Sequence, residues 1–230
     1  MKVAIVAFTL FSLAFQVLAE TRAREDHLDD LSPGSKRLKT GNHNNVLVAG
    51  QPINFARCDI RQQKKVKEVA KRVTERIKHA NKYLETSPLN KKRYHEWFGE
   101  FSETRYSTVQ SHFRWMERQA PSVTYDCDSC TTVLRLSTSP PLAYKTENGN
   151  VKTINLCPGF WKLPIYGFSS SPSPSQSQII IGLISMFKTM KGTKEFPGTN
   201  IREQAKRLAK ASPDKAVLNA VNHAIFAETD

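Results

Sequence analysis

Histidine is the side chain in this sequence best suited to bind a metal, and its spacing limits what it can do. On a helix, two ligands share one face when they are three or four residues apart, and a neighbouring glutamate can take a proton from metal-bound water. No two of the six histidines have this spacing, and His95-Glu96 lacks a second histidine. Phosphate-binding loops and GxSxG motifs are also missing from the sequence. The histidines are His27, His43, His79, His95, His112 and His223.

The four cysteines are the second group of residues with evident chemistry. Cys127 and Cys130 have the spacing of half a zinc ribbon, but the second pair that would complete the ribbon is missing. An even number of cysteines in an exported chain favours two disulfides over free thiols. Cys58 and Cys157 complete the set, and the residues alone leave the pairing open.

The N-terminus has the pattern of a secretory signal peptide. Lys2 precedes an apolar run over residues 3–15, and the small side chain of Ala19 ends the segment. The run is shorter than the roughly 20 residues that a membrane-spanning helix needs. We therefore expect residues 1–19 to be removed, giving a secreted, extracellular protein without a transmembrane segment. Without Lys2 its net charge is +12 instead of +13.

Residues 20–51 are polar and contain no aromatic side chain. This composition cannot bury a core. The segment is expected to be either a disordered arm or a short pro-segment that is cut after Arg37. Residues 52–230 remain, and they are long enough for one domain with a real core.

The pattern of apolar residues in this domain predicts helices first. Over residues 60–84 they recur every three or four positions, which predicts a long amphipathic helix. Similar spacing predicts a helix around Tyr94 and Phe98 and another around Val109 and Phe113. Gly99 indicates either the end of a helix or the close approach of another backbone.

The character changes to β-strand between residues 131 and 156. Strands are expected at residues 132–136, 142–144 and 151–156, and Asn148-Gly149 predicts a hairpin turn. A buried helix is expected over residues 178–188. From residue 199 onward we expect two helices separated at Ser212-Pro213, the second of which buries Val217, Leu218, Val221, Ile225 and Phe226.

The predicted helix over residues 60–84 carries the densest charge in the chain. It contains nine lysines and arginines and only two acidic residues, Glu68 and Glu75, which gives a net charge of +7. Such a surface is either a solvated face that aids solubility or a site for an acidic glycan, a nucleic acid or an acidic protein. The polyanion-binding candidates are Lys64, Lys65, Lys67, Lys71, Arg72, Arg76, Lys78 and Lys82.

Several segments agree in order and spacing with one known family. They are Arg93-Tyr94-x-x-Trp97-Phe98-Gly99, Arg105-x-Ser107-Thr108-Val109-x-x-His112-Phe113, Tyr125-Asp126-Cys127, Leu156-Cys157-x-x-Phe160-Trp161-Lys162-x-Pro164, Gly192-Thr193-Lys194 and Ser212-Pro213-Asp214-Lys215-Ala216-Val217-x-Asn219-Ala220-x-Asn222-His223. Together they resemble the deuterolysin, or aspzincin, family of fungal zinc endopeptidases, and most closely its lysine-specific branch.

This resemblance covers nearly all of residues 58–228. It implies an α+β fold: a mainly helical, zincin-like single domain with a small β-hairpin sheet. It also implies two disulfides, Cys58 with Cys127 and Cys130 with Cys157. In the shared segments, His112 and His223 are expected to have structural roles.

The resemblance further implies a zinc site, from whose pattern this chain departs. In the family one helix carries His-Glu-x-x-His, with two zinc ligands and a general base, and the aspartate of a following Gly-Thr-x-Asp is the third ligand. Alignment on Phe187 puts Gly182 and Met186 at the histidines and Leu183 at the glutamate. Glu195 takes the place of the aspartate.

Three further positions of the family's site are also altered. Gly198 takes the place of a tyrosine that stabilises the transition state, and Val221 and Ala224 replace the two acidic residues of the lysine-binding pocket. The alignment therefore predicts no catalytic residue, no metal ligand set and no cofactor. It also predicts that the former site has become ordinary core.

These expectations combine into a secreted, non-catalytic homologue of a fungal metalloendopeptidase that acts by binding. It would be an effector or extracellular interaction protein, with the basic helix as a polyanion site. The alternative is a secreted metalloendopeptidase with residual or non-standard zinc-dependent activity. A third possibility is a decoy that competes with an active paralogue.

Overall fold

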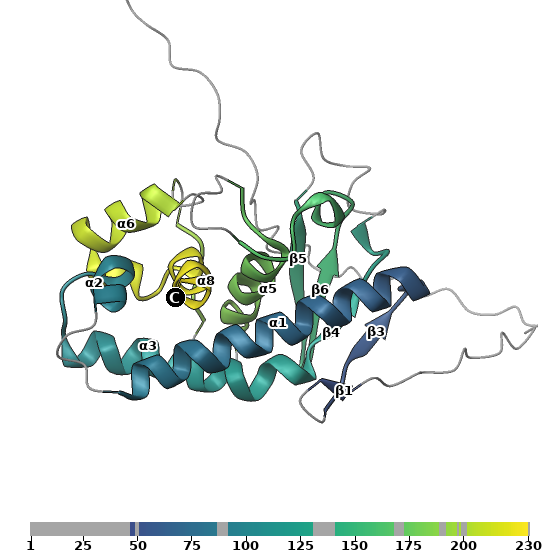
Figure 1. Cartoon of the computed structure of the whole chain (residues 1–230), viewed down its shortest axis with the longest axis horizontal. Helices are drawn as coiled ribbons and strands as arrows, with labels where there is room; N and C mark the ends of the chain where they lie inside the picture. Colours follow the sequence, from purple (N-terminus) through teal and green to yellow (C-terminus); the bar gives the residue numbers. More distant parts are fainter. Residues whose placement is uncertain are drawn as a thin grey trace, which may run out of the picture.

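A computed structural model of the chain describes residues 47–48, 51–86, 92–130, 141–167, 173–188, 192–196, 198 and 202–229. The predicted signal peptide, the cut at Arg37 and the predicted strand at residues 132–136 lie outside this part. The described residues form one mixed α/β domain with a small sheet at one end and helices over the rest (Figure 1). In this part of the chain no helix is long and apolar enough to cross a membrane.

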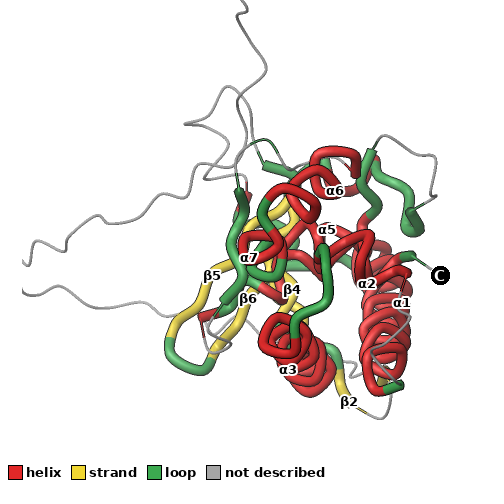
Figure 2. The backbone as a smooth tube through the Cα atoms, turned by 90° about the vertical axis from the view of Figure 1, so that its left-hand side faces the viewer, coloured by secondary structure: helices red, strands yellow, loops and turns green. Residues whose placement is uncertain are grey.

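The longest element is α1 (Ile60–Glu85), which confirms the predicted amphipathic helix. Its first turn is fixed by a capping box in which Asp59 accepts from the Gln62 backbone and the Gln62 side chain accepts from the Asp59 backbone. The apolar stripe of α1 is buried against the other helices, and Figure 2 shows α1 and α3 (Glu103–Gln119) lying side by side. Its buried apolar members are Val66, Val69, Ala70, Val73, Ile77, Ala80 and Leu84.

The short α2 (Lys92–Phe98) follows α1 and precedes α3 in the sequence. Gly99 ends it with φ +80°, and its N–H donates to the carbonyl of His95 at 3.0 Å. A Cβ atom at Gly99 would overlap the carbonyl oxygen of Ala209. Both expectations for Gly99 are therefore confirmed, because the helix ends there and another backbone comes close.

The sheet has four strands in the order β3 (Asn54–Ala56), β4 (Thr124–Asp126), β6 (Val151–Leu156) and β5 (Ala143–Asn148). The predicted hairpin is confirmed by antiparallel β5 and β6, with Ala143 opposite Leu156 and a turn that contains Gly149 at φ +56°. The sequence pattern did not reveal β3 and β4, which pair in parallel with each other, and β4 also pairs in parallel with β6. Just before them, β1 (Leu47–Val48) and β2 (Gln51–Pro52) form a separate antiparallel pair.

The C-terminal part contains α5 (Gln176–Ser185), α6 (Arg202–Ala211), α7 (Pro213–Ala216) and α8 (Ala220–Glu228). Pro213 begins a helix as predicted, but the expected single last helix is divided into α7 and α8. The chain leaves the helix because Lys194 N–H donates to Leu218 O at 2.9 Å and Ala220 N–H donates to Lys194 O at 3.0 Å. Leu218 consequently lies outside both helices and is 37% exposed, so the prediction that it is buried is wrong.

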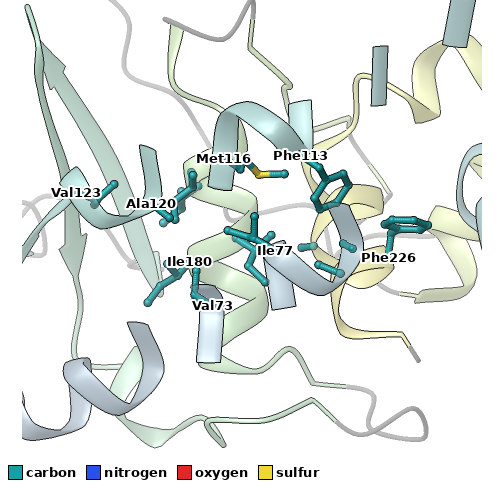
Figure 3. Packing of buried hydrophobic residues seen from close by; sticks show 14 of the residues in the cluster. Val73, Ile77, Phe113, Met116, Ala120, Val123, Ile180 and Phe226 are labelled. Carbon is teal, nitrogen blue, oxygen red and sulfur yellow. The ribbon is translucent and has the colours of Figure 1, made fainter. Parts of the chain in front are cut away.

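The main core lies where α1, α3, α5 and α8 meet. Figure 3 shows Val73 and Ile77 of α1 packed among side chains from the other three helices. Phe226 brings α8 into this cluster, with an edge contact to the ring of Tyr83 and a tilted contact to that of Phe113. The other labelled residues in the view are Met116, Ala120, Val123 and Ile180.

Both disulfides pair as the resemblance implied. Cys58 bonds Cys127, which ties the entry to α1 to the end of β4, and Cys130 bonds Cys157 at the end of β6. Next to the first bond, Arg57 has φ +52°, and its Nε donates to Asp126 Oδ2 at 3.2 Å. The end of the sheet nearest α1 is therefore held by a covalent bond and an adjacent ion pair.

Candidate functional site

Helix α5 carries the positions that the alignment assigned to the zinc-binding motif. A capping box fixes its start, because Ser175 Oγ accepts from the Gln178 N–H at 3.1 Å and the Gln178 side chain accepts from the Ser175 N–H at 3.0 Å. Leu183 is 5% exposed and belongs to the core, whereas Gly182 and the helix-ending Met186 are half-buried. The expectation that all three have become ordinary core is therefore correct only for Leu183.

The segment after α5 folds back against the end of that helix. Thr193 N–H donates to Ser185 O at 3.0 Å, and the hydroxyls of these two residues lie 2.6 Å apart. This turn places Glu195 in a half-buried position two residues after Thr193, where burial raises the pKa of its carboxyl to about 7. Gly198 lies at the surface with φ +72°.

The two positions aligned with the acidic lysine pocket lie on α8, close to α5. A Cβ atom built on Gly182 would lie 3.9 Å from the Ala220 carbonyl oxygen and 3.9 Å from the Ala224 Cβ. Val221, the residue after Ala220, is half-buried, and Ala224 is 5% exposed. The structure thus brings one aligned ligand position, Gly182, next to one aligned pocket position, Ala224, and neither side chain is polar.

A buried histidine pair lies beside these helices, and sequence spacing gave no sign of it. His223 Nδ1 donates to Asn219 O at 2.9 Å, which leaves its Nε2 as the acceptor of the N–H from His112 Nδ1 at 3.0 Å. Burial lowers the pKa of His112 to about 4. Burial, together with the nearby His112, lowers the pKa of His223 to about 3. Because 111 residues separate the two rings, only the tertiary structure joins them.

Acidification is expected to destabilise the domain through this pair. Both folded-state pKa values lie below the ordinary histidine value of 6.5, so below that pH the unfolded chain binds protons first. The pair's contribution is complete above pH 6.5 and is lost progressively as the pH falls towards 4. We expect the unfolding free energy, measured with urea, to fall by about 2–5 kcal/mol between about pH 7 and about pH 4.5.

Protonation of Glu195 has the opposite effect on the pH dependence of the unfolding free energy, so this residue is replaced in the experiment. Its folded-state pKa of about 7 is above the ordinary 4.5, so its protonation stabilises the folded form as the pH falls. The titration is therefore made in Glu195→Gln, with and without His112→Asn. An unfolding free energy independent of pH in the single variant would contradict the prediction, and the double variant should have the shallower profile.

The basic residues of α1 divide into held and exposed groups. Arg72 and Arg76 lie 3.6 and 3.8 Å from Glu228 Oε2, and the Glu228 side chain is only 1% exposed. Lys65 donates to the carbonyl of Trp161 at 3.1 Å. These three cations therefore serve contacts within the domain. The exposed members of the candidate set are Lys64, Lys71, Lys78 and Lys82.

With this geometry in place, comparison with known proteins identifies the relationship. Residues 83–228 match the family described as lysine-specific metallo-endopeptidase, and this match spans more than half of the chain. The chain belongs to the lysine-specific metallo-endopeptidase family. The expected family resemblance and the expected fold class are both confirmed.

Individual relatives of this metallo-endopeptidase family member agree. The peptidyl-Lys metalloendopeptidase of Grifola frondosa is 31% identical over 181 residues, which make up 78% of this chain but 48% of the relative. The enzyme of the same name from Pleurotus ostreatus is 29% identical over 177 residues, 76% of this chain and 96% of the relative. The structure of a zinc peptidase from Grifola frondosa superimposes with a TM-score of 0.63 at 31% identity, covering 74% of this chain and 96% of that one.

The expectation that no cofactor is involved is wrong at the level of the family. The family consists of metallo-endopeptidases, and the matching Grifola structure is that of a zinc peptidase. Zinc is therefore the metal that membership implies, and the sequence alignment alone had led to the opposite conclusion.

The aligned positions themselves fit a zinc ion poorly. Gly182 and Leu183 offer no donor atom, and the Met186 thioether suits zinc less well than imidazole does. Glu195 is the one aligned residue with a carboxylate. Within the described ranges, no three His, Cys, Asp or Glu side chains converge so that they could hold a metal ion. The chemistry that these residues supply by themselves is proton exchange at Glu195, whose pKa is near neutrality.

Proposed function

We propose that this metallo-endopeptidase family member is secreted and acts by binding an extracellular partner instead of hydrolysing peptide bonds. The observation that carries the proposal is Leu183. It occupies the place that the family motif gives to the general base, it is 5% exposed, and its side chain cannot accept a proton. This argument holds for the reaction whether or not a metal is bound nearby.

A peptidase assay tests the catalytic half of this proposal. We expect the purified chain to cleave a lysine-containing fluorogenic peptide no faster than buffer alone does. The reason is that Leu183, at the general-base position, cannot take a proton from the attacking water. The assay is run with and without added zinc, and an active lysine-specific peptidase of the same family serves as the positive control. Cleavage that a chelator abolishes would contradict the proposal.

The alternative function, non-standard zinc-dependent hydrolysis, has one observation in its favour. Glu195 has a pKa of about 7, the range in which a carboxylate exchanges protons efficiently near neutral pH. If cleavage is observed, the Glu195→Gln variant distinguishes hydrolysis that depends on Glu195 from partner binding along α1. Loss of that cleavage would support hydrolysis through Glu195, whereas binding through α1 does not involve this residue.

For the partner, we propose an acidic glycan bound along the exposed side of α1. Lys64, Lys71 and Lys78 repeat every seven residues, so they lie on one side of the helix at intervals of about 10 Å. Their side chains are exposed, and Lys82 extends the row by one turn. Glu68 and Glu75 lie between them, so the row has a lower net charge than the whole helix. Because all of these charges are exposed, salt should weaken the binding.

Heparin retention measures this binding. We expect the wild-type chain to bind a heparin column at about 0.15 M salt and the triple variant Lys64→Glu, Lys71→Glu, Lys78→Glu to elute at clearly lower salt. The control reverses three exposed cations of the C-terminal region, Arg207→Glu, Lys210→Glu and Lys215→Glu, with the same change in net charge. Equal loss in both variants would indicate an effect of net charge alone, and no retention of the wild type would remove the glycan from the proposal.

A further inference from the structure

An apolar strip remains partly exposed between α5 and α8, and the glycan proposal does not use it. On α5, Ile179 and Gly182 lie on one face because they are three residues apart, and Met186 caps the end of this helix. On the α8 side, Val221 follows Ala220, whose carbonyl oxygen faces Gly182, and is half-buried, and Leu218 is 37% exposed. We call this the α5–α8 strip: Ile179, Gly182, Met186, Leu218 and Val221.

Three lysines border the end of this strip. Lys188 follows Met186 by two residues and is exposed. The ammonium group of Lys145, on the edge strand β5, lies 5.5 Å from the ring centroid of Phe187, the residue next to Met186. Lys194 joins the strip through the hydrogen bond from its N–H to Leu218 O. We call Lys145, Lys188 and Lys194 the basic rim.

The charges of this rim are only partly balanced. Lys145 is half-buried and has no carboxylate within ion-pair distance among the described residues. Burial lowers the pKa of its ammonium group, the charge of Glu147 opposes this lowering in part, and Lys188 adds to it. The carboxylate of Glu147 accepts from the Lys188 backbone N–H at 2.8 Å. The surroundings of the strip therefore favour an anionic ligand over a cationic one.

We infer that the α5–α8 strip and its basic rim bind a protein segment that presents an apolar side chain next to acidic residues. The apolar side chain would cover Met186, Val221 and Leu218, and the acidic residues would meet the three lysines. The preference is opposite to that in the names of the peptidyl-Lys relatives. It follows from this chain's own charges at the rim and from Val221 and Ala224 on α8. The inference goes beyond the glycan proposal, since it concerns a different surface.

Fluorescence anisotropy tests this inference on the purified full chain. The probe is a short fluorescein-labelled peptide with a central leucine between glutamates, and the matched probe has lysines in place of the glutamates. We expect the glutamate peptide to bind at least about tenfold more tightly than the lysine peptide. Reversing Lys145 and Lys188 to glutamate should weaken the glutamate peptide by about tenfold, and Met186→Asp should weaken it further by removing the apolar contact.

The Lys64→Glu, Lys71→Glu, Lys78→Glu variant is the matched control, because it changes α1 and leaves the strip intact. It should bind the glutamate peptide as the wild type does, while the rim variants should keep their retention on heparin. Equal binding of both peptides, or no binding of either, would overturn the inference without touching the glycan proposal. Urea midpoints of all variants establish that a loss of binding is not a loss of folding.

Discussion

Removal of the disulfide between Cys58 and Cys127 is expected to lower the unfolding free energy by about 4 kcal/mol. The bond joins residues 69 apart in the sequence, and a longer closed loop restricts the unfolded chain more strongly. It also fixes the start of α1 to the end of β4. The strands that meet there, β3 and β4, have only three residues each, so their own pairing gives limited support. The measurement is urea denaturation of the Cys58→Ala, Cys127→Ala variant against the wild type under oxidising conditions.

The second disulfide provides the matched control for this measurement. Cys130 and Cys157 are 27 residues apart, so the double alanine variant at these positions should lose about 3.5 kcal/mol, less than the first pair. A larger loss from the shorter loop would contradict the argument from chain entropy. It would place the main stabilisation in contacts made around Cys130 and Cys157 instead.

Gly99→Ala is expected to be nearly as damaging, with a loss of about 2–5 kcal/mol. One part of the loss is backbone strain, because φ is +80° and an L-residue with a Cβ pays about 1–2 kcal/mol there. The other part is overlap: the new Cβ would collide with Ala209 O and lie 2.8 Å from Pro213 Cγ, and forcing atoms into a packed site costs about 1–3 kcal/mol.

Gly149→Ala separates these two contributions. Gly149 also has a positive φ, +56°, but a Cβ there would meet nothing within 4 Å. This variant should show only the backbone part, about 1–2 kcal/mol. If urea denaturation gives equal losses for the two variants, the close packing of α2 against the α6–α7 turn contributes nothing to stability, contrary to the prediction.

The ion pairs of α1 change how its high positive charge is understood. The net charge calculated from the sequence gives every lysine and arginine of the helix the same weight. In the folded domain Arg72 and Arg76 face the buried Glu228 near the end of α8, so they hold the C-terminal helix against α1. The proposed glycan would therefore contact chiefly the row that includes Lys64, Lys71 and Lys78, which is why the heparin experiment uses these three residues.

The sequence by itself determined the elements that carry a local signal. The apolar period of α1, the Asn148-Gly149 turn and Pro213 at a helix start each involve residues within a few positions of one another, so the pattern predicts them directly. The family's spaced motifs added the cysteine pairing, and comparison confirmed the family. Inference from the aligned positions alone went too far when it excluded a cofactor.

The tertiary structure decided everything that depends on residues far apart in the chain. Strands β3 and β4 are too short to show an alternating pattern, and they exist through pairing with partners 70 and 29 residues away. The His112–His223 hydrogen bond, the Glu228 ion pairs and the half-exposed α5–α8 strip likewise arise only when separate helices pack together. Local sequence cannot specify such contacts, because their energy comes from burial and pairing between elements and not from the preferences of either element alone.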